Sequence, residues 1–182
     1  MKKLGRILAM AAIMAAAVAA YASVAVGHDG GGRDGHGKKG DRHGRDHGMR
    51  HGASLIEQSL APSVPTDPAI HGVAAGGAPW VLDRGEVRLD RDGRFKLRVK
   101  GLVIPTLGNA GPVTTVSASL YCGADSDTTA VDTTPAVPLS SSGDARIFDD
   151  SFTTPSTCLA PVILLHPNGN TAAYIAVNGW RF

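Results

Sequence analysis

The chain has 182 residues, a formal net charge of +2, 43% hydrophobic residues and two cysteines. Its charge is unevenly placed: residues 27–52 carry a net +2, whereas the 130 residues that follow carry nine basic and twelve acidic groups, a net of −3. The length allows one domain and a tail, and the domain lacks the overall basic character of a nucleic-acid-binding protein.

Residues 1–22 are predicted to be a signal peptide. Lys2, Lys3 and Arg6 precede an apolar, alanine-rich run, and residues 20–22, Ala-Tyr-Ala, match the small-x-small cleavage pattern. An uncleaved anchor is the alternative, because the apolar run is barely long enough to span a bilayer and its alanines make it weakly hydrophobic. We expect cleavage, and therefore a secreted, extracellular protein with no transmembrane anchor.

Residues 23–68 are predicted to be a disordered linker. Gly, His, Asp and Arg dominate residues 27–52, which cannot bury enough apolar surface to offset their conformational entropy. The pattern Ser54-x-x-Glu57 is typical of a capping box, so a short helical turn is expected there, followed by a proline-stiffened extended segment.

Metal binding by this tail is one hypothesis. Imidazoles and nearby aspartates are ligands for Zn, Ni or Cu, but the interleaved glycines disfavour a helix that would align them, so chelation would be weak. The alternative is a hydrophilic spacer that holds the domain off the cell surface. Envelope contact is a further option, because the tract would become cationic below about pH 6 and could then attach to anionic wall polymers. No other cofactor is predicted. The candidate ligands are His28, His36, His43, His47 and His51.

The folded domain is predicted to span residues 69–182, and residues 85–104 are its clearest element. Apolar and charged residues alternate on both sides of Asp92-Gly93, which predicts a β-hairpin. A three-residue loop with Gly93 in the left-handed region pairs Leu89 with Phe95 and leaves one apolar face and one charged face. Shorter and longer loops would mix the two faces.

The charged face of the hairpin is the candidate interaction site of the domain. Four basic residues on one strand could meet anionic polymers or lipid headgroups, although the predicted register places Glu86 and Asp90 where they would neutralise two of them. No aromatic residues alternate with the basic ones to support base stacking. The four are Arg94, Lys96, Arg98 and Lys100.

The later strands are short and close together. Residues 113–122 alternate apolar positions with a hydroxyl-rich face, residues 145–152 place Ile147 inward, and residues 159–165 are apolar on both faces, as in a central strand. A short strand is expected near 129–131, and another at 173–177 after an Asn-Gly turn. The fold class is therefore all-β, an antiparallel β-sandwich with immunoglobulin-like topology as one option.

The two cysteines predict one disulfide, Cys122–Cys158, because an even count in an exported chain usually means pairing. The alternative is two buried thiols. A bridge that closes this loop would contribute roughly 3–4 kcal/mol in the chain-entropy view.

Catalytic constellations are not evident. The sequence has no nucleophile elbow, zinc-protease motif or phosphate loop. His71 and His166 lie in predicted turns without a nucleophile partner, and Asp149-Asp150 would point to opposite faces of a strand. Asp125, Asp127 and Asp132 only loosely match calcium-ligand spacing, and a solvated acidic loop is the simpler interpretation. We therefore predict that the protein is not an enzyme.

Three segments carry a family resemblance: GGAPWVLDRGEVRLDRDGRFKLRVKGLVIP, VTTVSASLYCG and CLAPVILLHPNGNTAAYIAVNGW. They resemble a family of small secreted bacterial proteins of unassigned function, over roughly residues 70–180. The resemblance implies a single extracellular β domain and supplies no catalytic residues. The leading hypothesis is a secreted, non-enzymatic module that acts at or near the cell envelope on its polymers. Metal binding by the tail is the second hypothesis, and a hydrolase is the third.

Overall fold

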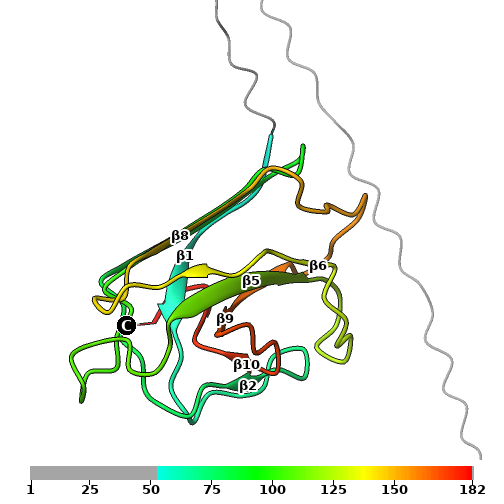
Figure 1. The fold of residues 1–182 in the computed structure, drawn as a ribbon. Helices are drawn as coiled ribbons and strands as arrows, with labels where there is room; N and C mark the ends of the chain where they lie inside the picture. The colour runs from blue at the N-terminus through cyan, green and yellow to red at the C-terminus, as the bar shows by residue number, and fades with distance from the viewer. Residues whose placement is uncertain (1–52, 182) are drawn as a thin grey trace, which may run out of the picture. The chain divides into compact units, whose positions relative to one another are not determined.

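The computed structural model describes residues 53–181, whose regular elements are all β-strands (Figure 1). This part of the chain contains no helix that could span a membrane. In chain order the strands are β1 (Ser54–Pro62), β2 (Ala74–Ala75), β3 (Arg84–Asp90), β4 (Phe95–Lys100), β5 (Thr115–Tyr121), β6 (Asp132–Thr133), β7 (Val137–Pro138), β8 (Ala145–Asp149), β9 (Val162–Pro167), β10 (Ala173–Tyr174) and β11 (Ala176–Asn178). The predicted signal peptide and histidine-rich tail lie outside the described residues.

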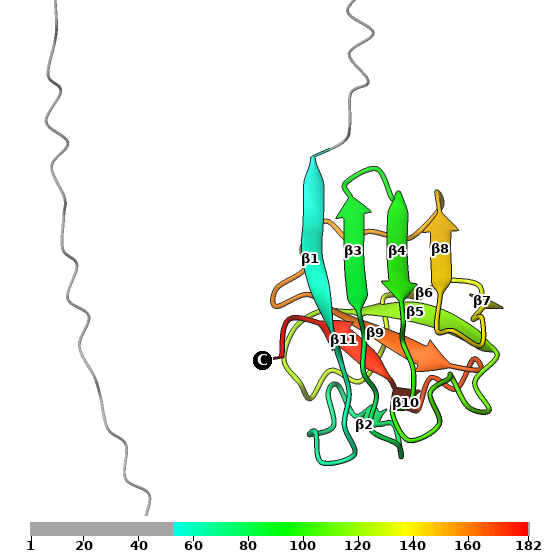
Figure 2. The same cartoon turned by 90° about the vertical axis from the view of Figure 1, so that its left-hand side faces the viewer.

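Nine of these strands form one antiparallel sheet in the order β6-β5-β9-β11-β1-β3-β4-β8, with β7 also paired to β5. Strand β1 joins two halves, because its first part pairs with β3 and its last three residues pair with β11. One half (β1, β3, β4, β8) lies over the other (β5, β9, β11), and the strands of the two halves cross, so that the sheet curls into a half-barrel (Figures 1 and 2). The all-β, antiparallel prediction is confirmed; the sandwich with immunoglobulin-like topology stays a prediction.

The core lies between the two halves and consists of the inward residues of both. The inward side chains of the first half are Val87, Leu89, Phe95, Leu97, Val99 and Ile147. Those of the second half are Val116, Ala118, Leu120, Ile163, Leu165 and Ala176. Burial of such side chains, at roughly 25 cal/mol per Å² of apolar surface, is the main force that holds the halves together.

The outer face of the second half is also covered. β2 and β10 form a small parallel sheet over it, and Val73, Tyr121, Leu164 and Tyr174 make a second apolar cluster there. The hydroxyl-rich face predicted for residues 113–122 is therefore buried, with Ser119 fully enclosed. An alternation with hydroxyl side chains predicts a solvent-exposed face. Here the additional layer of β2 and β10 covers that face and excludes water from it.

The hairpin register is confirmed. Leu89 pairs with Phe95 and Glu86 with Arg98, and the three-residue loop ends at Gly93, whose φ of 82° lies in the left-handed region. The Gly93 amide donates to the Asp90 carbonyl oxygen and closes the turn.

Substitution of Gly93 by alanine should lower the free energy of unfolding by about 2–3 kcal/mol, since a left-handed L-residue is strained and a clash adds to that strain. A Cβ at this position would lie 2.6 Å from the carbonyl oxygen of Phe152. Gly108→Ala is the matched control, because Gly108 has a φ of 65° but no atom within 4 Å of the added Cβ. Urea denaturation should show the larger loss at Gly93; equal losses would contradict the steric argument.

Strand β1 corrects the prediction for residues 53–68. The expected helical turn at Ser54 and the linker character of residues 54–62 are wrong, because this segment is a strand inside the sheet. Ile56 and Leu60 face the core, but Gln58, which pairs with Val87 between them, stays exposed and binds Asn178 of β11. This polar residue interrupts the alternation, so that the apolar residues recur four apart as in a helix.

The remaining elements agree in outline with the expectations. Ile147 is buried in β8, and β9 is central, flanked by β5 and β11. The strand expected near 129–131 begins at Asp132. The strand expected at 173–177 is divided, since β10 pairs with β2 and only β11 returns antiparallel to β9.

Candidate functional site

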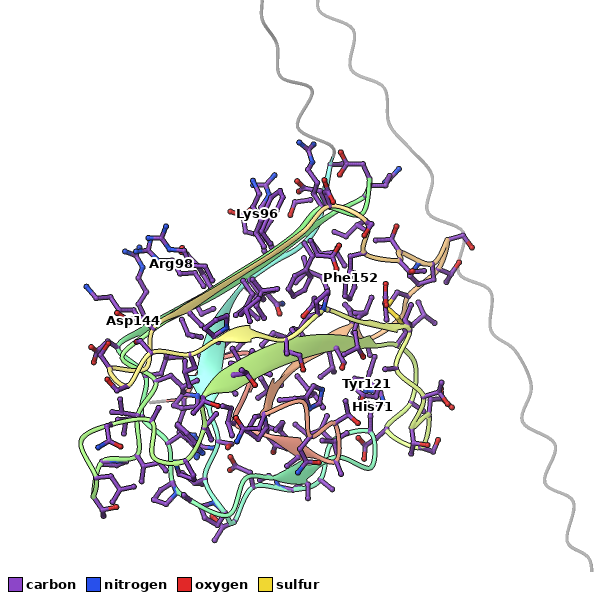
Figure 3. All side chains as sticks on the ribbon, viewed as in Figure 1. His71, Lys96, Arg98, Tyr121, Asp144 and Phe152 are labelled. Carbon is purple, nitrogen blue, oxygen red and sulfur yellow. A yellow bond between two sulfur atoms is a disulfide. The ribbon has the colours of Figure 1, made fainter. Side chains whose placement is uncertain are left out.

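The predicted basic stripe lies on the outer face of β4. Inward residues of this strand are buried and alternate with exposed Lys96, Arg98 and Lys100. Figure 3 shows Lys96 and Arg98 on the side of the strand away from the core, whereas Phe152 points between the two halves. Arg94 does not belong to this set, because it lies at the hairpin turn and its guanidinium binds Asp92 at 2.7 Å.

The pair at the turn is electrostatically satisfied. A hydrogen bond from Arg94 holds the pKa of the Asp92 carboxyl below its usual value, and the same contact raises the pKa of Arg94. Asp90 lies 4.0 Å from the Arg94 guanidinium as well. The anionic-surface role predicted for Arg94 therefore has little support, since its charge is already compensated.

The predicted neutralisation of Arg98 by Glu86 is wrong, although the two residues are opposite in register. Glu86 makes its ion pair with Arg84, at 3.9 Å. Asp90 and Glu57 both bind Arg88, at 2.8 and 3.2 Å. Within residues 53–181, Lys96, Arg98 and Lys100 form no ion pair.

Two residues of β8 extend this face. Arg146 is opposite Arg98 in the β4–β8 register and has no ion pair in the described part of the chain, and Phe148 is opposite Lys96. The Lys96 ammonium lies 5.7 Å from the centre of the Phe148 ring, which is a cation–π contact. Phe148 nevertheless remains 63% exposed. We call Lys96, Arg98, Lys100 and Arg146 the basic patch.

Arg146 and Phe148 were missed as site residues by sequence reasoning. Their outward direction followed from the prediction that Ile147 faces inward on the same strand. Their position beside β4 did not follow, because about fifty residues separate the paired segments.

The same outer face is hollowed into an open groove. It has a volume of about 600 Å³ and runs over β1, β3, β4 and β8. Its walls at the β1 and β3 end include Glu57, Ser59 and Glu86, and the other end is formed by Lys96, Arg98, Arg146 and Phe148.

Both isolated histidines of the domain are buried. His166 is fully buried; its Nδ1 lies 2.8 Å from the Ala173 carbonyl oxygen and its Nε2 lies 2.9 Å from Ser119 Oγ. Burial lowers the pKa of His166, with partial opposition from the Ala173 carbonyl. His71 is buried as well and stacks on Tyr121, with ring centres 5.1 Å apart (Figure 3).

The aspartates considered as calcium ligands bind backbone amides instead. Asp125 accepts from His71 N–H, and Asp127 accepts from Ala124 N–H. Burial opposes ionisation of Asp132, yet hydrogen bonds from Thr153 and Thr133 hold its pKa below the usual value. Among the described residues no group of three or more His, Cys, Asp or Glu could hold a metal ion.

The predicted disulfide is present. Cys122 follows β5 and Cys158 precedes β9, so the bond links two neighbouring strands at one end of the sheet. The candidate metal ligands of the tail lie outside the described residues, and that hypothesis stays a prediction. Comparisons of the chain with protein-family models, curated proteins and solved structures found no match.

Proposed function

We propose that the protein is a secreted, non-enzymatic module that acts at or near the cell envelope by binding an anionic polymer through its basic patch. The observation that carries this proposal is the group of four basic side chains on β4 and β8 without an ion pair in residues 53–181. On the fold, we propose that the half-barrel is a β-sandwich in which β1 belongs to both layers, with an immunoglobulin-like strand order as the finer version.

The unpaired basic side chains of the patch point to an anionic ligand. The domain as a whole carries a net −3, so four basic side chains without an ion pair on one face are opposite in sign to its overall charge. Like charges placed side by side in a sheet repel one another and reduce stability. A polyanion bound over Arg98 and Arg146 would remove that repulsion, and the interaction would weaken with salt as the charges are screened.

The predicted secretion is consistent with the disulfide, since such bonds persist in oxidising compartments. The non-enzymatic proposal is supported by the polar groups of the domain. In the described residues the Ser–His contact is that of Ser119 with His166, and both side chains are buried away from any substrate. A serine hydrolase would need such a pair at the surface.

Metal binding by the tail is retained as the alternative proposal, on the composition of residues 27–52 alone. It predicts retention on immobilised nickel that is lost when these residues are deleted.

The envelope proposal predicts that Arg98→Glu lowers the fraction of protein that co-sediments with isolated envelopes at low salt by about fivefold, because the substitution reverses charge inside the basic patch. Arg91→Glu is the control with the same change in net charge; Arg91 is exposed on the hairpin loop and makes no ion pair within residues 53–181. Added salt should release the wild-type protein.

A shortened chain that begins at Gly52 separates the contribution of the tail to envelope binding from that of the basic patch. This start keeps Ala53, whose carbonyl oxygen accepts from the Arg91 amide. If the shortened chain no longer pellets, or if both charge variants bind as the wild type does, the patch is not the attachment site.

A further inference from the structure

The groove on the outer face is built from two rows of side chains that run across the strands. One row contains Ser59, Glu86, Arg98 and Arg146, and the other contains Glu57, Arg88, Lys96 and Phe148. Each row crosses β1, β3, β4 and β8, a span of about 14 Å from three inter-strand spacings. The groove is therefore as long as a short oligosaccharide and open along its length.

The two ends of the groove have opposite chemistry. Glu57, Ser59 and Glu86 supply acceptor oxygens at the β1 and β3 end, and a carboxylate retains free lone pairs even when it binds one arginine. Lys96, Arg98 and Arg146 supply donors and positive charge at the β4 and β8 end. A ligand with anionic groups alone, such as a polyphosphate or a phospholipid surface, offers the two glutamates no donor, whereas a ligand with both hydroxyl and carboxylate groups would satisfy both ends.

Phe148 adds an apolar surface at the basic end. The Lys96 ammonium lies over one side of its ring, and most of the Phe148 side chain is exposed. A pyranose ring has an apolar C–H face that would cover this aromatic surface and remove it from water. Phosphate polymers have no such face.

We infer that the groove binds a carboxylated oligosaccharide, laid across the four strands with its acidic groups at Arg98 and Arg146, a sugar ring on Phe148 and its hydroxyls on Glu57 and Glu86. This inference rests on the proposed function, because it names the class of anionic polymer that the basic patch recognises.

The test is a calorimetric titration of the full mature chain at pH 7.5 and low salt, where unperturbed histidines are mostly neutral. The probe is a hexamer of galacturonic acid, and its methyl ester is the uncharged counterpart. The acid should bind at least about tenfold more tightly than the ester, since the ester cannot form charge-assisted hydrogen bonds with the arginines.

Substitutions inside and outside the groove test whether the oligosaccharide binds there. Arg98→Gln and Arg146→Gln should each weaken binding by about tenfold, because each removes a charged donor. Phe148→Ala should weaken binding by about fivefold through loss of the aromatic surface. The matched controls are Arg91→Gln, which removes the same charge outside the groove, and Leu107→Ala, which truncates another exposed apolar residue; both should change affinity by less than about twofold.

Sodium polyphosphate and vesicles of phosphatidylglycerol are titrated in parallel. If polyphosphate binds through Arg98 and the hexamer does not, the glycan inference is overturned while the proposed anionic-polymer function stands. Binding to the vesicles alone overturns both proposals, because a lipid surface is not a polymer. If none of the three probes binds, both proposals fall. Equal affinity for acid and ester, or binding unaffected by Arg98→Gln and Phe148→Ala, also overturns the inference.

Discussion

Removal of the Cys122–Cys158 disulfide should lower the free energy of unfolding by about 3–4 kcal/mol, because the unfolded chain regains the conformational freedom of the loop that the bond closes. The two cysteines are 36 residues apart, and this interval carries β6, β7 and β8. β8 is held to the rest of the first half by its pairing with β4. The net stability of a typical domain is about 5–15 kcal/mol, so this loss is a large fraction of it.

The variant for this experiment is Cys122→Ala together with Cys158→Ala, followed by urea denaturation. Reduction of the wild-type protein should produce the same midpoint shift, and the reductant should leave the double variant unchanged. A loss below about 1 kcal/mol would contradict the loop-entropy argument. A lower slope of unfolding free energy against urea would instead show that the native or unfolded state has changed in compactness.

Substitution of His166 by alanine should cost about 3–5 kcal/mol, the sum of a cavity and of buried hydrogen-bonding groups left without partners. A carbonyl oxygen can only accept, so Nδ1 of His166 carries the proton for Ala173, and Nε2 accepts from the Ser119 hydroxyl. Ser119 Oγ lies 2.8 Å from Thr133 Oγ1, which extends the chain of hydrogen bonds. Ser119→Ala removes the donor to Nε2 and the acceptor for the Thr133 hydroxyl, but Thr133 is exposed and can turn to water, so the substitution should cost about 1–2 kcal/mol.

The same histidine should make stability depend on pH. Its pKa is about 6.5 in an unperturbed chain and is lowered by burial in the folded state. Below pH 6.5 the unfolded state therefore binds more protons than the folded state, and stability falls as the pH decreases, by at most about 1.4 kcal/mol per pH unit, until the folded-state pKa is reached. At pH 7 and above the contribution of neutral His166 is fully present.

His166→Gln separates titration from packing. Glutamine keeps a donor and an acceptor but does not titrate, so the difference between wild type and variant should shrink as the pH falls from 7 to 5. Carboxylates with lowered pKa, such as Asp132, lose their contribution only at lower pH and act equally in both proteins. A pH-independent difference would show that His166 does not titrate in this range.

The candidate site was only half predictable from the sequence. Lys96, Arg98 and Lys100 follow from alternation within one strand, which local sequence specifies. Whether these charges are neutralised does not follow from the sequence, because each carboxylate has several basic side chains within reach. Glu86, for example, binds Arg84 rather than the opposite Arg98. The contribution of Arg146 depends on a strand pairing between distant segments.

The sequence by itself determined the hairpin with its register, the inward residues of β4, β5 and β8, and the partners of the disulfide. These depend on alternation, on turn chemistry at Asp92-Gly93, and on having only two cysteines. The tertiary structure alone decided that β1 is a strand shared by two layers, that β8 completes the basic patch, and that Ser119 and His166 are buried. Each of these depends on which distant segments pack together, and that choice is made by the whole core rather than by any local pattern.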